Sequence, residues 1–312
     1  MIICFRKIAS FLVLASTTVF GNPVHEQLPI NAGGILQWIK IDGANDRNPV
    51  LLYLHGGPGG SVMAYADKFT DELQLNFIVI QWDQRETGKT KSLNTSAARM
   101  TVSLFEGDAI DVINYLRNKF HQEKIYLAGH SWGGFLALQL AAHHPDLFRA
   151  CFAAAPMIHQ VVSEKMALDK MTATAKEENN TKALRELASI KIPFENGTQL
   201  YYHRKWLYKL LNRKNPPFSI AYVDQWAGTW LPLFNEASAI NFFETVPEIQ
   251  CPVYFLVGTN DYQANFQLTE NYFQKVKAEK KELFWFTNSA HSLNLTEPRK
   301  FQEVMIQVRN QQ

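Results

Sequence analysis

The stretch from Ile125 to His144 constrains the fold of this chain more than any other. Its first residues, Ile125 to Ala128, form a continuous run with few polar groups, which is typical of a strand covered on both faces in a parallel sheet. A turn between two glycines, Gly129 and Gly133, follows at once, and a helical pattern then continues to His144. The stretch therefore predicts a strand, a tight turn and a helix in direct succession, as in an α/β fold.

The same alternation of strand and helix patterns runs through most of the chain, with one interruption. Strands are predicted over 35–41, 49–54, 77–80, 125–128, 151–155, 252–257 and 282–286, and helices over 101–120, 133–144, 266–278 and from 298. From about 158 to 248 the chain is instead helical, charged and free of buried-strand runs. We interpret residues 22–157 and 249–312 as two parts of one α/β core, and residues 158–248 as an inserted helical cap.

The first 21 residues resemble a secretory signal peptide. Arg6 and Lys7 precede an apolar run over 8–20, and Gly21 offers a small residue for cleavage. As a helix, these thirteen apolar residues rise about 20 Å, less than the ~30 Å hydrocarbon core of a membrane. We therefore expect export, to the periplasm or outside the cell, with no stable membrane insertion after cleavage. An uncleaved membrane anchor is the alternative.

Charge and motif content exclude several function classes. The formal net charge is +2, and Arg6 and Lys7 account for both units, so the mature chain gives no reason to expect a nucleic acid partner. The sequence contains neither Cys-x-x-Cys nor His-Glu-x-x-His, and no dinucleotide-binding glycine pattern. We expect no metal and no cofactor, a small molecule or short peptide as substrate, and leave the oligomeric state open.

Ser131 occupies the turn between the predicted strand and helix. The run Gly-His-Ser-Trp-Gly over 129–133 has the form of a nucleophile elbow, in which a strained backbone projects a serine hydroxyl above the sheet. The glycines leave room for the backbone to close, and the N-terminus of the following helix favours a developing negative charge. This setting predicts that Ser131 is a catalytic nucleophile.

A serine of ordinary pKa needs a base, and the base needs an acid that orients it. In proteins with this elbow the acid and then the histidine follow the serine along the chain, each after a later strand. Asp261 and His291 each follow one of the last two predicted strands. We predict that His291 accepts the proton of Ser131 and that Asp261 fixes the tautomer of His291. Asp224 and Glu244, both in the inserted segment, are the alternative acids.

Two backbone N–H groups are expected to form an oxyanion hole. One belongs to Trp132, the residue after the nucleophile, and the other to a loop after an earlier strand. The run His-Gly-Gly-Pro-Gly-Gly over 55–60 lies at that place, and Gly57 is the predicted second donor. The alternative, a phosphate-binding loop, requires a Lys-Ser/Thr pair that is absent here.

With these motifs in order, the chain resembles the prolyl iminopeptidase family of α/β-hydrolases. The glycine run over 55–60, Asp-Gln-Arg over 83–85 and Gly-His-Ser-Trp-Gly-Gly over 129–134 carry the resemblance. It is good over 35–156, looser over 252–301 and poor across the insertion. The resemblance implies an eight-stranded, mostly parallel sheet with a helical cap over the site, and release of an N-terminal residue, often proline, from peptides.

Two departures from the family pattern concern the substrate. The family usually has glycine after Asp-Gln-Arg, where this chain has Glu86. The family also holds the substrate's amino group with cap glutamates, often just after a tryptophan, and neither Trp226 nor Trp230 is followed by one. A buried ammonium needs a carboxylate partner. The carboxylates near these tryptophans are Asp224, Glu236 and Glu244.

The leading hypothesis is a serine aminopeptidase that releases a small apolar N-terminal residue from short peptides. A carboxylesterase or lactonase on small acyl substrates would use the same triad and oxyanion hole, and is the alternative. A non-catalytic receptor on the same scaffold would need none of the triad residues. The resemblance also makes the strands that start at Cys151 and Cys251 neighbours, so a disulfide between these cysteines is possible.

Overall fold

The computed structural model describes residues 21–94, 99–213 and 216–311. The predicted signal peptide lies outside the described residues except for Gly21. An eight-stranded sheet has the order β1-β2-β4-β3-β5-β6-β8-β10, and every neighbouring pair from β4 to β10 is parallel, whereas β2 is antiparallel to both its neighbours. The strands are β1 (Val24–Ala32), β2 (Ile35–Gly43), β3 (Val50–Leu54), β4 (Ile78–Asp83), β5 (Ile125–His130), β6 (Phe148–Ala154), β8 (Val253–Gly258) and β10 (Lys281–Phe286). The predicted eight-stranded, mostly parallel sheet is confirmed.

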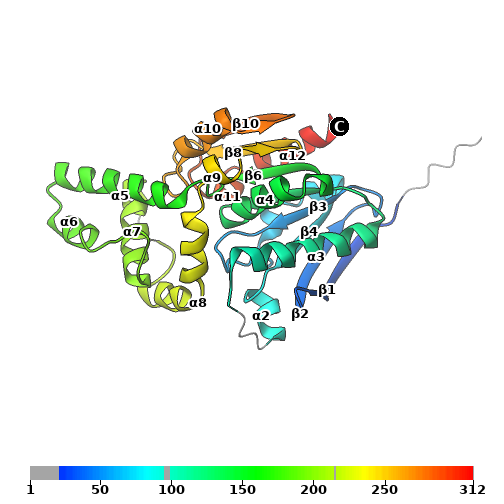
Figure 1. Ribbon diagram of the computed structural model, residues 1–312, viewed down its shortest axis with the longest axis horizontal. Helices are drawn as coiled ribbons and strands as arrows, with labels where there is room; N and C mark the ends of the chain where they lie inside the picture. Colours follow the sequence, from blue (N-terminus) through cyan, green and yellow to red (C-terminus); the bar gives the residue numbers. More distant parts are fainter. Residues whose placement is uncertain (1–20, 95–98, 214–215, 312) are drawn as a thin grey trace, which may run out of the picture.

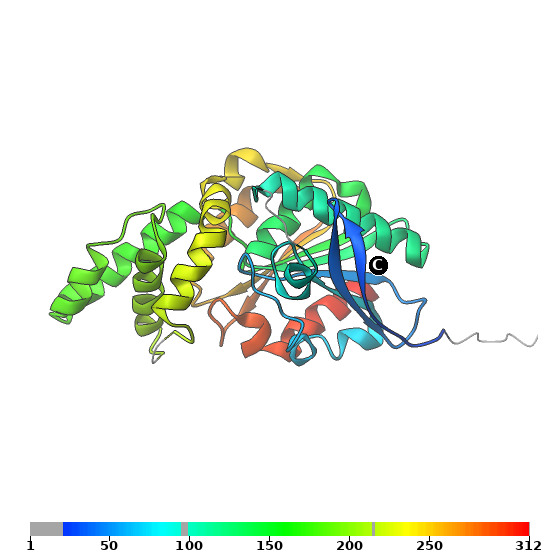
Figure 2. The same cartoon turned by 90° about the horizontal axis from the view of Figure 1, so that it is seen from below.

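Helices cover both faces of this sheet (Figure 2). Residues that alternate along β3, such as Leu52 and Tyr53, belong to separate buried clusters on the two faces, as expected for strands that are buried throughout. One cluster contains residues of α3, α4 and α10, and the other contains residues of α1, α11 and α12. These helices are α1 (Leu73–Asn76), α3 (Val102–Phe120), α4 (Trp132–His143), α10 (Phe266–Lys275), α11 (Leu293–Thr296) and α12 (Pro298–Asn310), and the short α2 (Gly88–Leu93) lies beside β2 and β4.

β1 was not predicted from the sequence, and α10 ends earlier than predicted. β1 forms the outer edge of the sheet, where most of its side chains are partly or fully exposed and Pro29 is tolerated. It therefore lacks the apolar run by which the inner strands were found. The helix expected over 266–278 ends at Lys275, because Lys277 and Ala278 extend as β9 (Lys277–Ala278) and pair with β7 (Glu248–Ile249).

Five helices lie between β6 and β8 along the chain, and most of them project from one end of the molecule, at the left of Figure 1. Asn180, Asn196 and Ser219 cap three of them, each with a side chain that accepts a backbone N–H three residues on. Within the described residues, none of the helices combines the length and apolar character needed to cross a membrane. The five are α5 (Gln160–Glu177), α6 (Thr181–Leu187), α7 (Gly197–Leu210), α8 (Ile220–Ala239) and α9 (Phe242–Thr245).

The two cysteines of the described chain are buried beneath α4 and are not bonded to each other. β6 and β8 are neighbours, with Cys151 opposite Val253, as the resemblance implied. Both cysteines are nevertheless free. The thiol of Cys151 lies 3.6 Å from the carbonyl oxygen of Ala137, and that of Cys251 lies 3.9 Å from that of Ala141. Burial raises the pKa of Cys251 to about 12, so its thiol is unreactive.

Candidate active site

Ser131 lies in a strained turn that requires a glycine two residues before it and another two residues after it. Its φ of 57° and ψ of −117° place it at the junction of β5 and α4, and its N–H donates to the Ala154 carbonyl 2.9 Å away. A Cβ on Gly129 would lie 2.0 Å from the carbonyl oxygen of Gly133, and one on Gly133 would lie 2.1 Å from that of Leu54. The two glycines are therefore required by backbone contacts on both sides of the turn.

The structure brings Ser131, His291 and Asp261 together in the predicted order. His291 Nε2 lies 2.9 Å from Ser131 Oγ, and His291 Nδ1 lies 2.9 Å from Asp261 Oδ2. Asp261 follows β8 and His291 follows β10, so the parallel strands deliver both loops to the same edge of the sheet. The other oxygen of Asp261 accepts the N–H groups of Gln263 and Ala264, which fix the carboxylate.

His130, inside the elbow, holds the His291 loop rather than the nucleophile. Its Nε2 lies 2.7 Å from the carbonyl oxygen of His291. Burial, together with the nearby His291, lowers the pKa of His130 to about 4, so the ring is neutral near pH 7 and donates its Nε2–H to that carbonyl. The sequence gives no sign of this role, because it depends on a contact across 161 residues.

The alternative acids lie elsewhere in the structure. Asp224 is exposed on α8 and accepts a hydrogen bond from Thr198, while Glu244 is exposed on α9 and accepts one from Asn241. Neither carboxylate contacts His291 in the described structure. The geometry thus favours Asp261 as the partner of His291.

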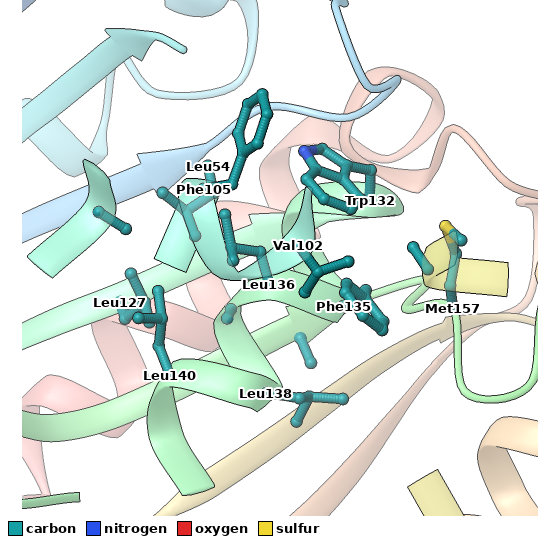
Figure 3. Close-up of a cluster of buried hydrophobic side chains, with 14 of the residues drawn as sticks. Leu54, Val102, Phe105, Leu127, Trp132, Phe135, Leu136, Leu138, Leu140 and Met157 are labelled. Carbon is teal, nitrogen blue, oxygen red and sulfur yellow. The ribbon is translucent and has the colours of Figure 1, made fainter. Parts of the chain in front are cut away.

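Trp132, the first residue of α4, has a backbone N–H with no acceptor inside the helix. Its buried ring packs edge-on against Phe105 and stacks on Phe135 (Figure 3). The indole Nε1–H donates to Gln84 Oε1 over 2.9 Å. The ring is therefore fixed, and the Trp132 N–H stays at the N-terminus of α4 beside Ser131.

The glycine loop lies beside the elbow, since a Cβ on Gly56 would lie 3.4 Å from Ser131 Cβ, and Gly57 is on the cavity wall. Gly57 has a φ of 123°, and a Cβ there would lie 2.7 Å from the backbone nitrogens of Gly59 and Gly60. His55, buried before the loop, lies with its Nδ1 2.8 Å from the carbonyl oxygen of Gly56. Glycine is required at position 57 both for conformation and for space.

Gln84 connects the two segments that carry the predicted oxyanion donors. Its backbone N–H donates to His55 Nε2, its Nε2 donates to the His55 carbonyl, and its Oε1 accepts from Trp132. Burial lowers the pKa of His55, which keeps the ring neutral and leaves Nε2 free to accept. Sequence reasoning took Asp-Gln-Arg as a family motif without assigning Gln84 this connection.

Glu86, the residue after the same motif, is where the chain departs from the family pattern. Arg85 forms a fully buried pair with Asp108, with two nitrogen–oxygen distances of 2.9 and 2.7 Å, and also donates to the Gly33 carbonyl. Glu86 then has a φ of 57°, in the left-handed region that glycine enters without strain. The position therefore suits the family's glycine better than the residue found here.

A cavity of about 270 Å³ opens onto Ser131 and His291 between the glycine loop and the inserted helices. Its wall on the helical side is largely apolar and aromatic. Trp226 also donates its indole N–H to the carbonyl oxygen of Pro58 over 2.9 Å, which joins α8 to the glycine loop. The apolar and aromatic residues are Met157, Leu200, Phe218, Val223, Trp226 and Phe234, joined by Tyr208 and Tyr222.

None of the described residues that line this cavity is Asp or Glu. The residues outside the described ranges include no Asp or Glu either. Glu236 accepts the backbone N–H of Val102 at the start of α3, so none of the three carboxylates considered for a substrate amine lies on the wall. Among the described residues of the wall, Arg204 carries a charged side chain, which pairs with the buried Glu164.

The described residues include no group of three or more His, Cys, Asp or Glu side chains arranged to hold a metal ion. The chemistry available at the site is that of a serine hydroxyl, a histidine and a carboxylate in hydrogen-bonded sequence, next to backbone N–H groups. This arrangement is suited to acyl transfer.

A family model described as the alpha/beta hydrolase fold matches residues 49–297 of the chain. This protein belongs to that family. The α/β-hydrolase is 29% identical over 297 residues to the probable aminopeptidase YbaC of Bacillus subtilis (strain 168), covering 87% of this chain and 92% of YbaC. It is 25% identical over 286 residues to a proline iminopeptidase of Heyndrickxia coagulans, covering 88% and 94%.

Solved structures agree on the fold. A proline iminopeptidase from Mycobacterium smegmatis superposes with a TM-score of 0.65 at 18% identity, covering 92% of this chain and 98% of that one. Together with the two sequence relatives, this confirms the resemblance to prolyl iminopeptidases that the motifs indicated.

Proposed function

We propose that this α/β-hydrolase is a serine hydrolase that acts through an acyl-enzyme on Ser131. The observation that carries the proposal is the continuous chain of contacts from Ser131 Oγ through His291 to Asp261, with both distances at 2.9 Å. Such a chain has no structural purpose in a receptor. It positions a base on a hydroxyl that would otherwise be a poor nucleophile.

In the proposed first step, Ser131 Oγ attacks the substrate carbonyl carbon. Because Asp261 accepts the Nδ1–H of His291, the lone pair of His291 Nε2 faces the Ser131 hydroxyl and takes its proton. His291 then gives that proton to the leaving amine or alcohol. The buried Asp261 carboxylate stabilises the imidazolium formed in between.

The negative charge on the carbonyl oxygen is stabilised by the Trp132 and Gly57 N–H groups and by the N-terminus of α4. Loss of one such donor typically costs about 3 kcal/mol of transition-state stabilisation. Water then attacks the acyl-enzyme with His291 as base, and Ser131 is regenerated. The Gln84 contacts to His55 and Trp132 hold the two donor segments in place relative to each other.

Peptides are the first candidate substrate class. The name of the Bacillus subtilis relative and that of the Heyndrickxia coagulans relative both point to release of N-terminal residues. The apolar cavity fits a small apolar residue such as proline. We therefore propose an aminopeptidase of prolyl iminopeptidase type.

Small esters or lactones are the second candidate class, and one observation favours them. A substrate ammonium would meet no carboxylate among the described residues of the cavity wall. An unpaired buried ammonium costs several kcal/mol, a cost that a neutral acyl group does not incur.

Labelling with a fluorophosphonate tests the nucleophile without knowledge of the substrate. We expect labelling of the wild type and none of Ser131→Ala. Proline arylamide, 4-nitrophenyl acetate and 4-nitrophenyl butyrate then separate the substrate classes. Ester turnover without arylamide turnover would remove the peptidase proposal, and full activity in Ser131→Ala would overturn the mechanism.

We further propose that residues 1–21 direct export and are removed. The basic and apolar pattern of this segment supports the proposal. N-terminal sequencing of the protein purified from its own host should begin at Asn22. Recovery of the intact N-terminus from the membrane fraction would instead favour the anchor.

A further inference from the structure

A buried ion pair in the inserted helices has not been assigned a role by the mechanism above. Arg204 on α7 binds Glu164 on α5 through both oxygens, with Nη1 2.6 Å from Oε2 and Nη2 2.5 Å from Oε1. Glu164 is 1% exposed and Arg204 8% exposed. Although burial alone would raise it, the pKa of Glu164 is held below its ordinary value by Arg204 and its other partners, so the pair is ionised.

The guanidinium of Arg204 is saturated on one edge and free on the other. Its Nη1 and Nη2 each donate to Glu164, and the second Nη1 hydrogen meets His203 Nδ1 at 2.8 Å. His203 can accept there because its Nε2 donates to the Glu164 carbonyl. An arginine has five N–H groups in a planar fork. The Nε–H and the second Nη2–H, which lie side by side, have no acceptor among the described residues.

Arg204 is the member of this ion pair that reaches the cavity wall. Arg204 lines the same cavity as Ser131 and His291, and its Nε, although without an acceptor, is not sealed from solvent. The guanidinium carbon lies 5.7 Å from the centre of the Phe194 ring, which holds the plane in place. Two parallel N–H donors of an arginine match the two oxygens of a carboxylate.

We propose that the Nε and Nη2 edge of Arg204 binds a carboxylate of the substrate, so that the enzyme acts on small acyl compounds or short peptides that carry one. The proposal rests on the proposed function, because it places this carboxylate in the cavity of Ser131. The carboxylate can belong to the acyl group or to the leaving group, as at the C-terminus of a short peptide. Arg204 is then a specificity-determining residue.

Glu164 holds Arg204 in place but weakens the attraction of this site for a bound carboxylate. The carboxylate fixes the guanidinium, yet its negative charge cancels that of Arg204 and disfavours a second anion nearby. Burial lowers the pKa of His203 to about 4, so this ring adds no charge near pH 7. Removal of the Glu164 charge should therefore strengthen binding of a carboxylate. It should weaken binding of an ammonium if Glu164 instead served a substrate amine.

The test compares matched substrates in two variants. 4-Nitrophenyl hydrogen glutarate carries an acyl carboxylate and 4-nitrophenyl butyrate does not; 4-(butyryloxy)benzoate carries a leaving-group carboxylate and 4-(butyryloxy)benzamide does not. The readout is the ratio of kcat/KM for the charged over the neutral member, in which changes common to both cancel. We expect Glu164→Gln to raise the ratio about tenfold for one of the two pairs, and Glu164→Gln with Arg204→Gln to bring it about tenfold below wild type.

The double variant removes both charges, so no unpaired ion is left buried. Fluorophosphonate labelling of Ser131 verifies that each variant retains its site. The matched control is Lys205→Gln with Glu186→Gln, which removes the ion pair of the next residue on α7 and does not touch the cavity wall. This control should leave both ratios unchanged.

A ratio that is the same in wild type, Glu164→Gln and the double variant would overturn the proposal. So would a fall of proline arylamide turnover in Glu164→Gln with no gain for either carboxylate. Titration of monomethyl glutarate and dimethyl glutarate into Ser131→Ala separates this proposal from the proposed function. Binding of the monomethyl ester alone, lost in the double variant, supports the carboxylate site even if Ser131 proves not to be the nucleophile; equal or absent binding of both contradicts it.

Discussion

The elbow edge of the sheet and the helical wall of the cavity are built in different ways. At the elbow, backbone atoms meet at distances that admit no side chain, as Gly129 and Gly133 show. On the helical wall, side chains meet side chains, and the Glu164–Arg204 pair joins two helices through residues that lie 40 positions apart. The first kind of contact fixes one geometry for the reacting groups. The second can be rebuilt by substitution, so we expect substrate choice to depend on the wall.

The largest effect expected at the elbow edge is chemical. Ser131→Ala removes Oγ but keeps a residue that tolerates the same backbone. We expect kcat/KM to fall about 10⁴-fold or more, because the members of a serine triad act as a unit. The free energy of unfolding should change little, which denaturant titration checks. Measurable turnover within tenfold of wild type would show that another group reacts.

A substitution that adds a Cβ against the backbone should destabilise the same edge of the sheet. Gly133→Ala places a Cβ 2.1 Å from the carbonyl oxygen of Leu54, where the backbone of α4 packs on the end of β3. We expect a loss of about 4 kcal/mol in the free energy of unfolding. Gly107→Ala, on α3 with no heavy atom within 4 Å of the added Cβ, is the matched control and should gain about 0.5–1 kcal/mol. Equal effects of the two substitutions would refute the comparison.

On the helical side of the molecule, a buried histidine should make the free energy of unfolding depend on pH. The pKa of the buried His203 lies at about 4 in the folded chain, below the ordinary ~6.5, so the unfolded chain binds more protons between these values. Its contribution is present above pH 6.5 and is lost as the pH falls towards 4. Replacement by glutamine should flatten this loss by about 3 kcal/mol at most.

Urea unfolding of wild type and His203→Gln at pH 7 and pH 4.5 measures the difference. His144→Gln, at an exposed histidine, is the control and should follow the wild type. A steeper pH dependence in His203→Gln than in the wild type would contradict the buried neutral ring.

The smallest effect is expected where the two regions touch. Trp226→Phe removes the 2.9 Å hydrogen bond to Pro58 while keeping an aromatic ring on the wall. Since a neutral hydrogen bond contributes about 1 kcal/mol, kcat/KM should fall about fivefold. Trp206→Phe removes an indole hydrogen bond to the Glu186 carboxylate, away from the cavity, and we expect no change in kcat/KM there. Steady-state kinetics on one ester decides between them.

The same contrast explains how far sequence reasoning reached. Ser131, Asp261 and His291 could be placed because each follows a buried strand, and parallel strands carry such residues to one edge. Gln84 could not be assigned, since its partners depend on how three loops pack. Glu164 and Arg204 escaped for a related reason: a charged residue in a helix gives no sign of which distant helix it will face. β1 was missed because an edge strand lacks an apolar run.

The hydrogen bonding of β6 to β8 has a consequence for how such proteins diversify. The chain leaves the sheet after Ala154 and returns at Val253 into the adjacent strand, where the N–H of Ala155 still binds the carbonyl of Leu256. The inserted segment therefore leaves the sheet and returns to it at two adjacent strands. Replacement by another set of helices needs no new strand pairing. What a new set of helices must supply instead is side chains such as Gln160 and Ser163 on α5, which bind the Gln263 carbonyl beside Asp261.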